Sequence, residues 1–397
     1  MKNLGVEPNH EFNNGELKGF GVQQTTQDAL ADVREDAARA YYYPVMNRQN
    51  LVVIANTTAT RVLWSQDSPS GKAVASGAEV IDREGVVFTI HANREVILSA
   101  GAIRSPAILE HSGVGNPSIL SRQSINVKVN LPAVGENLQD QTIMIVTATA
   151  INQNSSGLPG FVAHTSLHDL FSNKTSSFYE STKAKLSGYA QSIAAQNGGA
   201  SSAATQEYIL KTQLDLLMNS NTPTSEVIPI ALGDLIGVAF WALQPFSRGS
   251  VHINSTNRVA QPMIDSKFFQ FDFDGIMAVE TAKFARKFLT TEPVSGRVNI
   301  STINPSFELV PEDASDDIWL DWVKTKSLFE PNYHHLGTCA MLPRKMGGVV
   351  DNDFRVYGTE NVRVVDLSVV PLQVAGHSTS LLYGIAEWAA QKLRAKH

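Results

Sequence analysis

The sequence predicts a mixed α/β protein, and three patterns point to this class. Short apolar runs separated by turns that contain Gly or Pro occupy residues 51–90 and are typical of a small antiparallel meander. A buried-strand pattern at 95–98 leads through small residues into a helical stretch. Near the C-terminus, the β-branched run 362–365 precedes apolar residues at helical spacing over 382–393.

The elements before the middle of the chain follow from local patterns. An alanine-rich stretch at 29–40 follows a polar start and predicts a helix. The meander is expected to contain four strands, at residues 51–54, 61–64, 73–81 and 86–90.

The segment after the strand at 95–98 predicts a turn and a helix. Ser105 and Pro106 fit the N-cap and first position of a helix that Gly113 or Gly115 ends. A strand, a small-residue turn and a helix in succession are how α/β proteins hold a phosphate-bearing cofactor. Tight packing explains the same glycines equally well.

The middle of the chain, about 151–220, is polar and predicts a surface-facing insertion with helices near 184–195 and 203–217. From Glu226 the chain turns apolar again, and 245–253 reads as a turn that enters a strand.

Composition limits the function classes. The 397 residues are 43% hydrophobic and 18% charged, which is ordinary for a soluble globular protein. The net charge of −6 and the absence of a Lys/Arg cluster argue against nucleic acid and anionic membranes as partners. No apolar run approaches the roughly 18 residues that a membrane helix needs.

The sequence features that bear on secretion disagree. The first residues lack the apolar core of a signal peptide, so none is expected in this chain. The single Cys339 excludes an intrachain disulfide. Five Asn-x-Ser/Thr sequons weakly favour a secreted glycoprotein; they begin at Asn56, Asn154, Asn173, Asn254 and Asn299.

Two histidines form the candidate catalytic pair, because each lies where the backbone changes direction. His334 lies in a turn that ends at Gly337, and His377 lies at or just before the start of the final helix. Free N–H groups at a helix start attract an anion or a cofactor oxygen that gains charge. A capping or surface role is the more common explanation for a histidine at a helix start, so neither residue decides the function.

Other chemistries have less support. No Gly-x-Gly-x-x-Gly, Walker, CxxC or HExxH motif occurs. A hydrolase that uses Asp366 and His377 would need a Gly-x-Ser-x-Gly elbow, which the sequence lacks. A metal site at His334, His335 and His377 would need a nearby carboxylate or thiolate.

Long motifs carry a resemblance to a known family. Residues 99–115 (SAGAIRSPAILEHSGVG) and 131–141 (LPAVGENLQDQ) resemble signature stretches of the glucose–methanol–choline oxidoreductases. Residues 332–338 (NYHHLGT), 346–351 and 361–366 are most similar to the glucose oxidase and FAD-dependent glucose dehydrogenase members of that family.

The resemblance implies an organisation and a reaction. It implies part of an FAD-binding α/β domain at 1–145, a substrate domain with an antiparallel sheet and covering helices at 146–335, and a return to the first domain at 336–397. The family's C-terminal region would start near 247. Members bind FAD, oxidise a sugar or alcohol hydroxyl and pass electrons to oxygen or a quinone. Secretion and a homodimer are also expected.

The same resemblance assigns site residues. His334 and His377 would be the acid/base pair during hydride transfer to flavin N5, and Glu226 would orient His334. Asn332 and Trp241 would contact the substrate. The cofactor would be contacted by Ala59 at its adenine side and, around the flavin and diphosphate, by Asp366, Leu367, His377 and Ser378.

Three departures from the family pattern matter. The Gly-x-Gly-x-x-Gly of the family's first βαβ unit is absent, so we expect the chain to lack that N-terminal FAD-binding unit. Glu330 replaces an arginine of the glucose enzymes, and Ile228 replaces an aromatic residue, and both changes argue against glucose itself. The alternative function is a truncated or degenerate family fragment without activity of its own.

Overall fold

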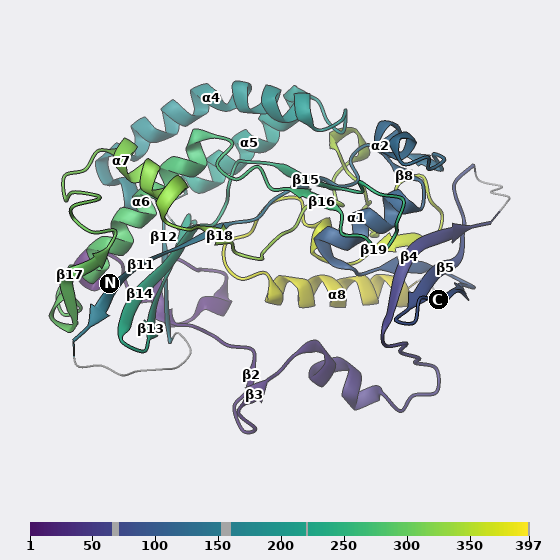
Figure 1. Cartoon of the computed structure of the whole chain (residues 1–397), viewed down its shortest axis with the longest axis horizontal. Helices are drawn as coiled ribbons and strands as arrows, with labels where there is room; N and C mark the ends of the chain where they lie inside the picture. The colour runs from purple at the N-terminus through teal and green to yellow at the C-terminus, as the bar shows by residue number, and fades with distance from the viewer. Residues whose placement is uncertain (66–70, 152–159, 220, 396–397) are drawn as a thin grey trace.

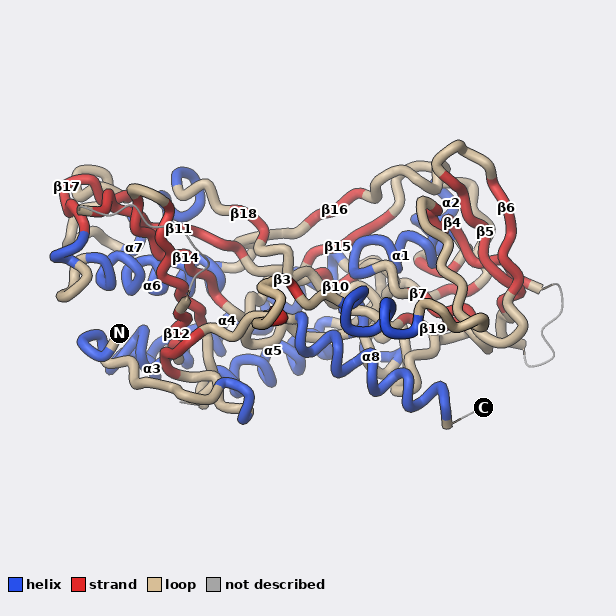
Figure 2. Tube along the Cα trace, turned by 90° about the horizontal axis from the view of Figure 1, so that it is seen from below, coloured by secondary structure: helices blue, strands red, loops and turns tan. Residues whose placement is uncertain are grey.

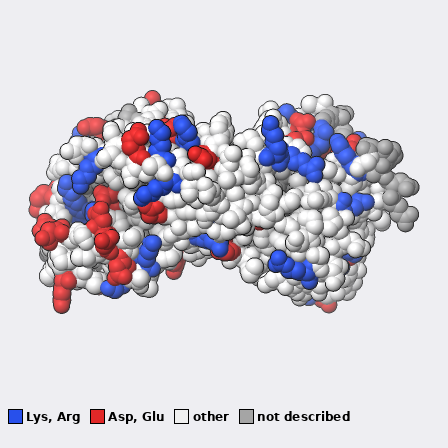
Figure 3. Space-filling view, turned by 90° about the horizontal axis from the view of Figure 1, so that it is seen from above, with Lys and Arg blue, Asp and Glu red and all other residues white. Residues whose placement is uncertain are grey.

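The computed structural model describes residues 1–65, 71–151, 160–219 and 221–395. Figure 1 shows two lobes, one around a large sheet with helices α4 to α7 and one with α1, α8 and smaller sheets. Acidic side chains gather mainly over the lobe of the large sheet in Figure 3. Antiparallel sheets with covering helices confirm the mixed α/β class.

Seven strands form the large sheet, in the order β1-β12-β13-β14-β11-β17, with β18 paired to β11. Every pairing is antiparallel. The bounds are β1 Gly19–Val22, β11 Thr142–Ala150, β12 Phe161–Thr165, β13 Ser225–Leu232, β14 Leu235–Ala242, β17 Val298–Asn304 and β18 Glu330–Pro331.

The two faces of this sheet have different neighbours. Helices α6 (Asp272–Leu289) and α7 (Asp316–Asp321) pack on one face, where Val227 and Phe240 join the main core. Because side chains alternate along a strand, Ile228 and Trp241 point to the opposite face and form a smaller apolar cluster. That second face contains the candidate site.

A helical layer lies beside the sheet and comprises α3 (Leu167–Phe171), α4 (Thr175–Gln196) and α5 (Ala203–Leu217). The last two confirm the helices expected in the polar middle region. The layer buries an apolar core of its own, which includes Leu186, Leu210 and Phe246. The region is therefore more than a surface insertion.

The other lobe contains the expected antiparallel meander, β4-β5-β6, and a parallel pair, β7-β19. Residues 51–54 are exposed and form no strand, contrary to expectation. The principal bounds are β4 Thr57–Trp64, β5 Ala75–Asp82, β6 Val87–His91, β7 Val96–Leu98, α1 Gly101–His111, β19 Val362–Val364 and α8 Thr379–Arg394.

Smaller elements complete the lobes. The strands are β2 Gln27–Asp28, β3 Val33–Arg34, β8 Val114–Gly115, β9 Val129–Asn130, β10 Glu136–Leu138, β15 Gly249–His252 and β16 Met263–Asp265. The remaining helices are α2 Pro117–Arg122 and the short turns Lys2–Leu4, Phe12–Asn14, Ala38–Tyr42, Tyr43–Val45, Ser172–Lys174, Ser295–Arg297, Trp322–Lys326, Arg344–Met346 and Leu367–Val369.

Helix α8 runs along the underside of the molecule, as Figure 2 shows. It begins two residues after His377, which confirms the expected place of that histidine at a helix start. No helix in the described ranges has both the length and the apolar character needed to cross a membrane.

The helix expected at 29–40 is wrong. The segment forms the small β2-β3 hairpin, and only Ala38–Tyr42 is helical. The carboxylate of Asp28 accepts hydrogen bonds from the N–H groups of Leu30, at 3.0 Å, and Ala31, at 3.1 Å. Such side-chain bonds favour a turn over a helix, and the exposed segment has little packing to oppose them.

The expected start of α1 at Ser105 and Pro106 is also wrong, because the helix begins at Gly101 and contains both residues. Pro106 has no N–H for the carbonyl of Ala102, four residues earlier. The buried Thr338 hydroxyl donates to that carbonyl at 2.6 Å. A side chain from the loop that carries His334 therefore replaces the missing helix bond, while Gly113 follows the helix end as expected.

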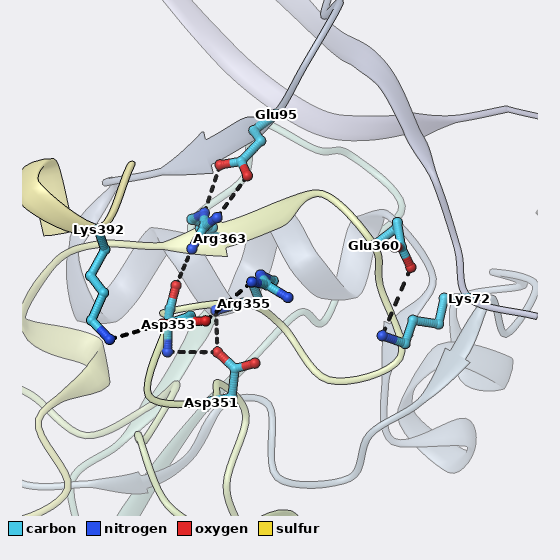
Figure 4. A network of polar contacts seen from close by, with 8 residues as sticks. All are labelled: Lys72, Glu95, Asp351, Asp353, Arg355, Glu360, Arg363 and Lys392. Atoms are coloured by element: carbon cyan, nitrogen blue, oxygen red, sulfur yellow. Dashed lines mark hydrogen bonds and ion pairs between the residues drawn. The ribbon is translucent and has the colours of Figure 1, made fainter. Parts of the chain in front are cut away.

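A buried ion pair connects the C-terminal part of the chain to β7, and Figure 4 shows it with its neighbours. Arg363 of β19 donates two hydrogen bonds to Glu95, at 2.6 and 2.7 Å, and a third to the backbone carbonyl of Asp353. Only 1% of the Arg363 side chain is exposed. Since Asp366 follows β19 directly, this pair also positions the start of the candidate cofactor segment.

We predict that Arg363→Met lowers the free energy of unfolding by about 3–5 kcal/mol, because it leaves the Glu95 carboxylate without its bidentate partner. Lys326→Met is the matched control, since it removes an exposed ion pair and should cost less than about 1 kcal/mol. Urea unfolding followed by circular dichroism measures both, and equal losses would contradict the role of Arg363.

Candidate active site

Glu226 and His377 join the two lobes. Glu226 lies on β13, opposite Trp241 of β14, and points to the second face of the sheet. Its Oε1 atom lies 2.8 Å from Nε2 of His377, which precedes α8. The Glu226 side chain is 1% exposed and that of His377 is 45% exposed. The pairing of Glu226 with His334 expected from the sequence is therefore replaced by a pairing with His377.

Burial and hydrogen bonding set the charges of this pair. Burial raises the pKa of Glu226, but its interactions with His164 and His377 outweigh burial and bring the pKa to about 2. The hydrogen bond that His377 makes to Glu226 raises the pKa of His377 above its ordinary value of 6.5, and this outweighs the opposing effect of burial. Both shifts favour the ionised forms, a carboxylate paired with an imidazolium.

His334 is held by Gln141, which the sequence did not single out. Nδ1 of His334 lies 2.8 Å from Oε1 of Gln141, and Nε2 of Gln141 donates to the carbonyl of Leu243 at 2.9 Å. Because this fixes the amide orientation, Gln141 presents an acceptor and Nδ1 of His334 carries the proton. Nε2 of His334, without a hydrogen-bond partner among the described residues, has its lone pair available.

The pKa of His334 is shifted in the opposite direction from that of His377. Burial lowers the pKa of His334 to about 4, and the neighbouring His377 charge acts in the same direction. The two ring centroids lie 5.2 Å apart. The site therefore places a neutral base beside an imidazole whose protonated form is favoured, which is an arrangement suited to proton transfer and to stabilising negative charge on oxygen.

The four expected substrate residues lie in different surroundings. Trp241 is buried and its ring centroid lies 6.4 Å from His334 and 6.0 Å from His377. Ile228 packs in the same apolar cluster. The amide nitrogen of Asn332 donates to Oε1 of Gln141 at 3.2 Å and also lies 3.2 Å from Nδ1 of His334, so the amide faces this histidine and its partner. Glu330 is exposed on β18, beside Ile143 of β11.

One of the segments expected to contact a cofactor, at Asp366, meets the turn between β7 and α1. Asp366 accepts hydrogen bonds from Gly101 N at 2.9 Å, Ser105 Oγ at 2.5 Å and Ser368 N at 2.8 Å. Leu367 is next in the chain, and its carbonyl accepts from Gly337 N at 3.4 Å. The carboxylate of Asp366 therefore braces the turn and is not a free contact group.

A cofactor can approach this turn closely only where the backbone is not covered by side chains. Gly101 has φ +77°, and a Cβ added there would meet nothing within 4 Å. Ser378, directly before α8, is the N-cap residue of that helix. Ala59 is exposed on β4, in the β4-β5-β6 meander of this lobe. Small side chains and exposed backbone are what close approach of a large cofactor requires.

We predict that ¹H–¹⁵N spectra of histidine-labelled protein show His377 losing its second proton at a pH above its ordinary pKa of 6.5, and a neutral His334 with its proton on Nδ1 at pH 7. His334 should gain its second proton near pH 4. His377 has a raised pKa, so its ion pair contributes fully to stability below pH 6.5 and loses that contribution as pH rises through the folded-state pKa.

Gln141→Met tests the cause of the His334 tautomer, because it removes the acceptor while keeping an unbranched side chain. Both neutral tautomers should then be populated. An unchanged Nδ1–H form of His334 in this variant would contradict the role assigned to Gln141.

Solved structures share this fold. An FAD-dependent oxidoreductase from Chaetomium thermophilum superposes with a TM-score of 0.85 and 23% identity, over 100% of this chain and 70% of that one. A fungal aryl-alcohol oxidase gives a TM-score of 0.83 and 24% identity, over 100% of this chain and 69% of that one. At these identities the likeness concerns the fold.

Curated relatives are similar in sequence. Glucose oxidase-like protein fsoC from Humicola fuscoatra is 37% identical, over 98% of this chain and 66% of its own length. Glucose oxidase from Aspergillus carbonarius is 32% identical, over 97% of this chain and 62% of its own length. The chain thus spans less than two thirds of the length of these relatives.

Two family models, both described as GMC oxidoreductase, match the chain at residues 1–143 and 245–386. The N-terminal match begins at residue 1, which does not support the expectation that the family's N-terminal FAD-binding unit is lacking. The two matches together cover more than half of the sequence, and the chain belongs to the GMC oxidoreductase family.

Proposed function

We propose that the chain carries the catalytic face of an FAD-dependent oxidoreductase that oxidises a CH–OH group of a sugar or alcohol. The observation that carries the proposal is the pair of imidazoles 5.2 Å apart whose pKa values are shifted in opposite directions. FAD, when bound, supplies the hydride acceptor at N5 and passes electrons on to oxygen or a quinone.

The two histidines would share the proton chemistry at the hydroxyl. Nε2 of His334 accepts the hydroxyl proton, since Nδ1 already donates to Gln141. The imidazolium of His377 stabilises the developing negative charge on the same oxygen. Glu226 keeps that imidazolium charged and fixes the ring through Nε2, which leaves Nδ1 to face the substrate.

Several residues would hold the cofactor. The open backbone at Gly101, the segment from Asp366 to Leu367, and the start of α8 at His377 and Ser378 would contact the flavin and the diphosphate. The exposed backbone of Ala59 would contact the adenine. The support is that Asp366 hydrogen-bonds to Gly101 although the two residues are far apart in sequence.

The walls beside the histidines favour an alcohol with an apolar substituent over a hexose. Ile228, Trp241 and Leu243 are buried together, with Ile143 and Ile145 packed against them. Sugar hydroxyls against such a surface would lose hydrogen bonds to water without replacement. Glu330 at the edge adds an anion and no donor for the oxygens of a sugar.

We predict that Glu330→Arg raises turnover of glucose relative to a primary alcohol with an aromatic substituent, because a guanidinium supplies donors where the carboxylate has none. Glu207→Arg on the exposed surface of α5 introduces the same charge change and should leave the ratio unaltered. An unchanged ratio in Glu330→Arg would remove this residue from the specificity argument.

The first experiment is to purify residues 1–397, desalt them and measure bound flavin by visible absorbance and mass spectrometry. One FAD per chain would permit substrate screening. Protein that stays colourless after refolding with FAD would favour the alternative, a family fragment without activity of its own.

In flavin-loaded protein, His334→Ala should slow flavin reduction by an alcohol by about 100- to 10,000-fold, the usual contribution of a general base, while FAD stays bound. His91→Ala changes an exposed histidine on β6 and serves as the control. Reduction at the wild-type rate in His334→Ala would reassign the base.

A further inference from the structure

We propose that His164 is a positioning residue that holds the second oxygen of Glu226, so that His164, Glu226 and His377 form a three-membered array. This inference rests on the proposed function for the role of His377. His164 itself touches neither histidine of the catalytic pair through any hydrogen bond among the described residues, and it would act only through Glu226.

The sheet register places the two side chains together. His164 of β12 and Glu226 of β13 are direct antiparallel partners. Directly opposed residues have Cβ atoms about 5 Å apart and project from the same face. Nε2 of His164 lies 3.6 Å from Oε2 of Glu226, whereas His377 contacts the other oxygen, Oε1.

Buried polar atoms need hydrogen-bond partners, and the facing atoms of His164 and Glu226 have no others among the described residues. Oε2 of Glu226 and both ring nitrogens of His164 are buried and without hydrogen bonds within the described part of the chain. An isolated carboxylate oxygen in such surroundings is costly, and so is an isolated imidazole N–H. A side-chain movement of less than about 1 Å brings Nε2 and Oε2 to hydrogen-bond distance and satisfies both atoms.

The surroundings of His164 leave Glu226 as the hydrogen-bond partner of Nε2 among the described residues. The ring of Phe12 packs edge-on at 5.5 Å between centroids, and the side chain is 6% exposed. The titratable groups coupled to Glu226 are His164 from β12, His377 from the segment before α8, and His334, whose pKa the Glu226 charge raises. Trp241 opposite Glu226 on β14 carries no charge.

The array has a consequence for the site. With Oε1 on His377 and Oε2 on His164, the carboxylate cannot rotate without breaking a hydrogen bond. Its negative charge is stabilised at both oxygens, which opposes the effect of burial on the pKa of Glu226. His164 therefore keeps Glu226 ionised and aimed at His377.

The test compares His164→Phe, which keeps a ring without a donor, with His164→Gln, which restores one. The readout is the ¹³Cδ resonance of Glu226 against pH in ¹³C-glutamate-labelled protein, assigned by its loss in Glu226→Gln. Circular dichroism verifies folding at each pH. The exposed His168→Phe on α3 is the matched control.

The expected direction of the pH effect follows from the lowered pKa of Glu226. The ion pair is present above the folded-state pKa and is lost as pH falls through it. His164→Phe should move this loss to higher pH by about one unit or more, while His164→Gln and His168→Phe should titrate like the wild type. Equal titration of Glu226 in the wild type and His164→Phe would overturn the proposal.

A second measurement needs no variant at the site. In wild-type protein, ¹H–¹⁵N spectra should show a proton on Nε2 of His164, and a proton on Nδ1 alone would overturn the array even where His164→Phe failed to fold. Neither measurement uses flavin or substrate. Failure of the array would leave alcohol oxidation to be tested separately, and absence of oxidation would leave the titration interpretable.

Discussion

The buried carboxylate of Glu226 is the constraint on which the arrangement of the site depends. A charge in the interior of a sheet requires a cationic partner, and Glu226 finds it in His377, 151 residues later in the chain. That contact fixes where the segment before α8 meets the sheet. It also separates the pKa values of two adjacent imidazoles, because like charges about 5 Å apart disfavour each other and, of the two, His377 is the one hydrogen-bonded to the carboxylate.

Local patterns in the sequence were sufficient for features that depend on nearby residues. His377 was placed correctly because a β-branched strand, a proline and a helical repeat surround it within about thirty residues. The helix α5 and the meander were predicted for the same reason, since their spacing of apolar residues is a local property. Trp241 was identified from the resemblance; it lies buried beside both histidines, and its contact with the substrate stays a prediction.

Features that depend on distant partners could not be read from the sequence. Gln141 lies within a motif that was recognised, but its role follows only from the fold that brings it to His334. His164 carried no sequence signal, because strand register alone places it opposite Glu226. The helix expected at 29–40 was wrong for a different reason. The expectation rested on the alanine content and did not consider that the carboxylate of Asp28 can accept backbone hydrogen bonds that favour a turn.

The proline inside α1 couples that helix to the catalytic loop. Pro106 leaves the carbonyl of Ala102 without a helix donor, and Thr338 supplies one from a segment 236 residues away. A fluctuation that displaced Thr338 would expose an unpaired buried carbonyl, so the first turn of α1 and the loop that carries His334 open together or not at all. The two segments form one cooperative unit in local unfolding, and the loop gains the rigidity of a helix without being helical.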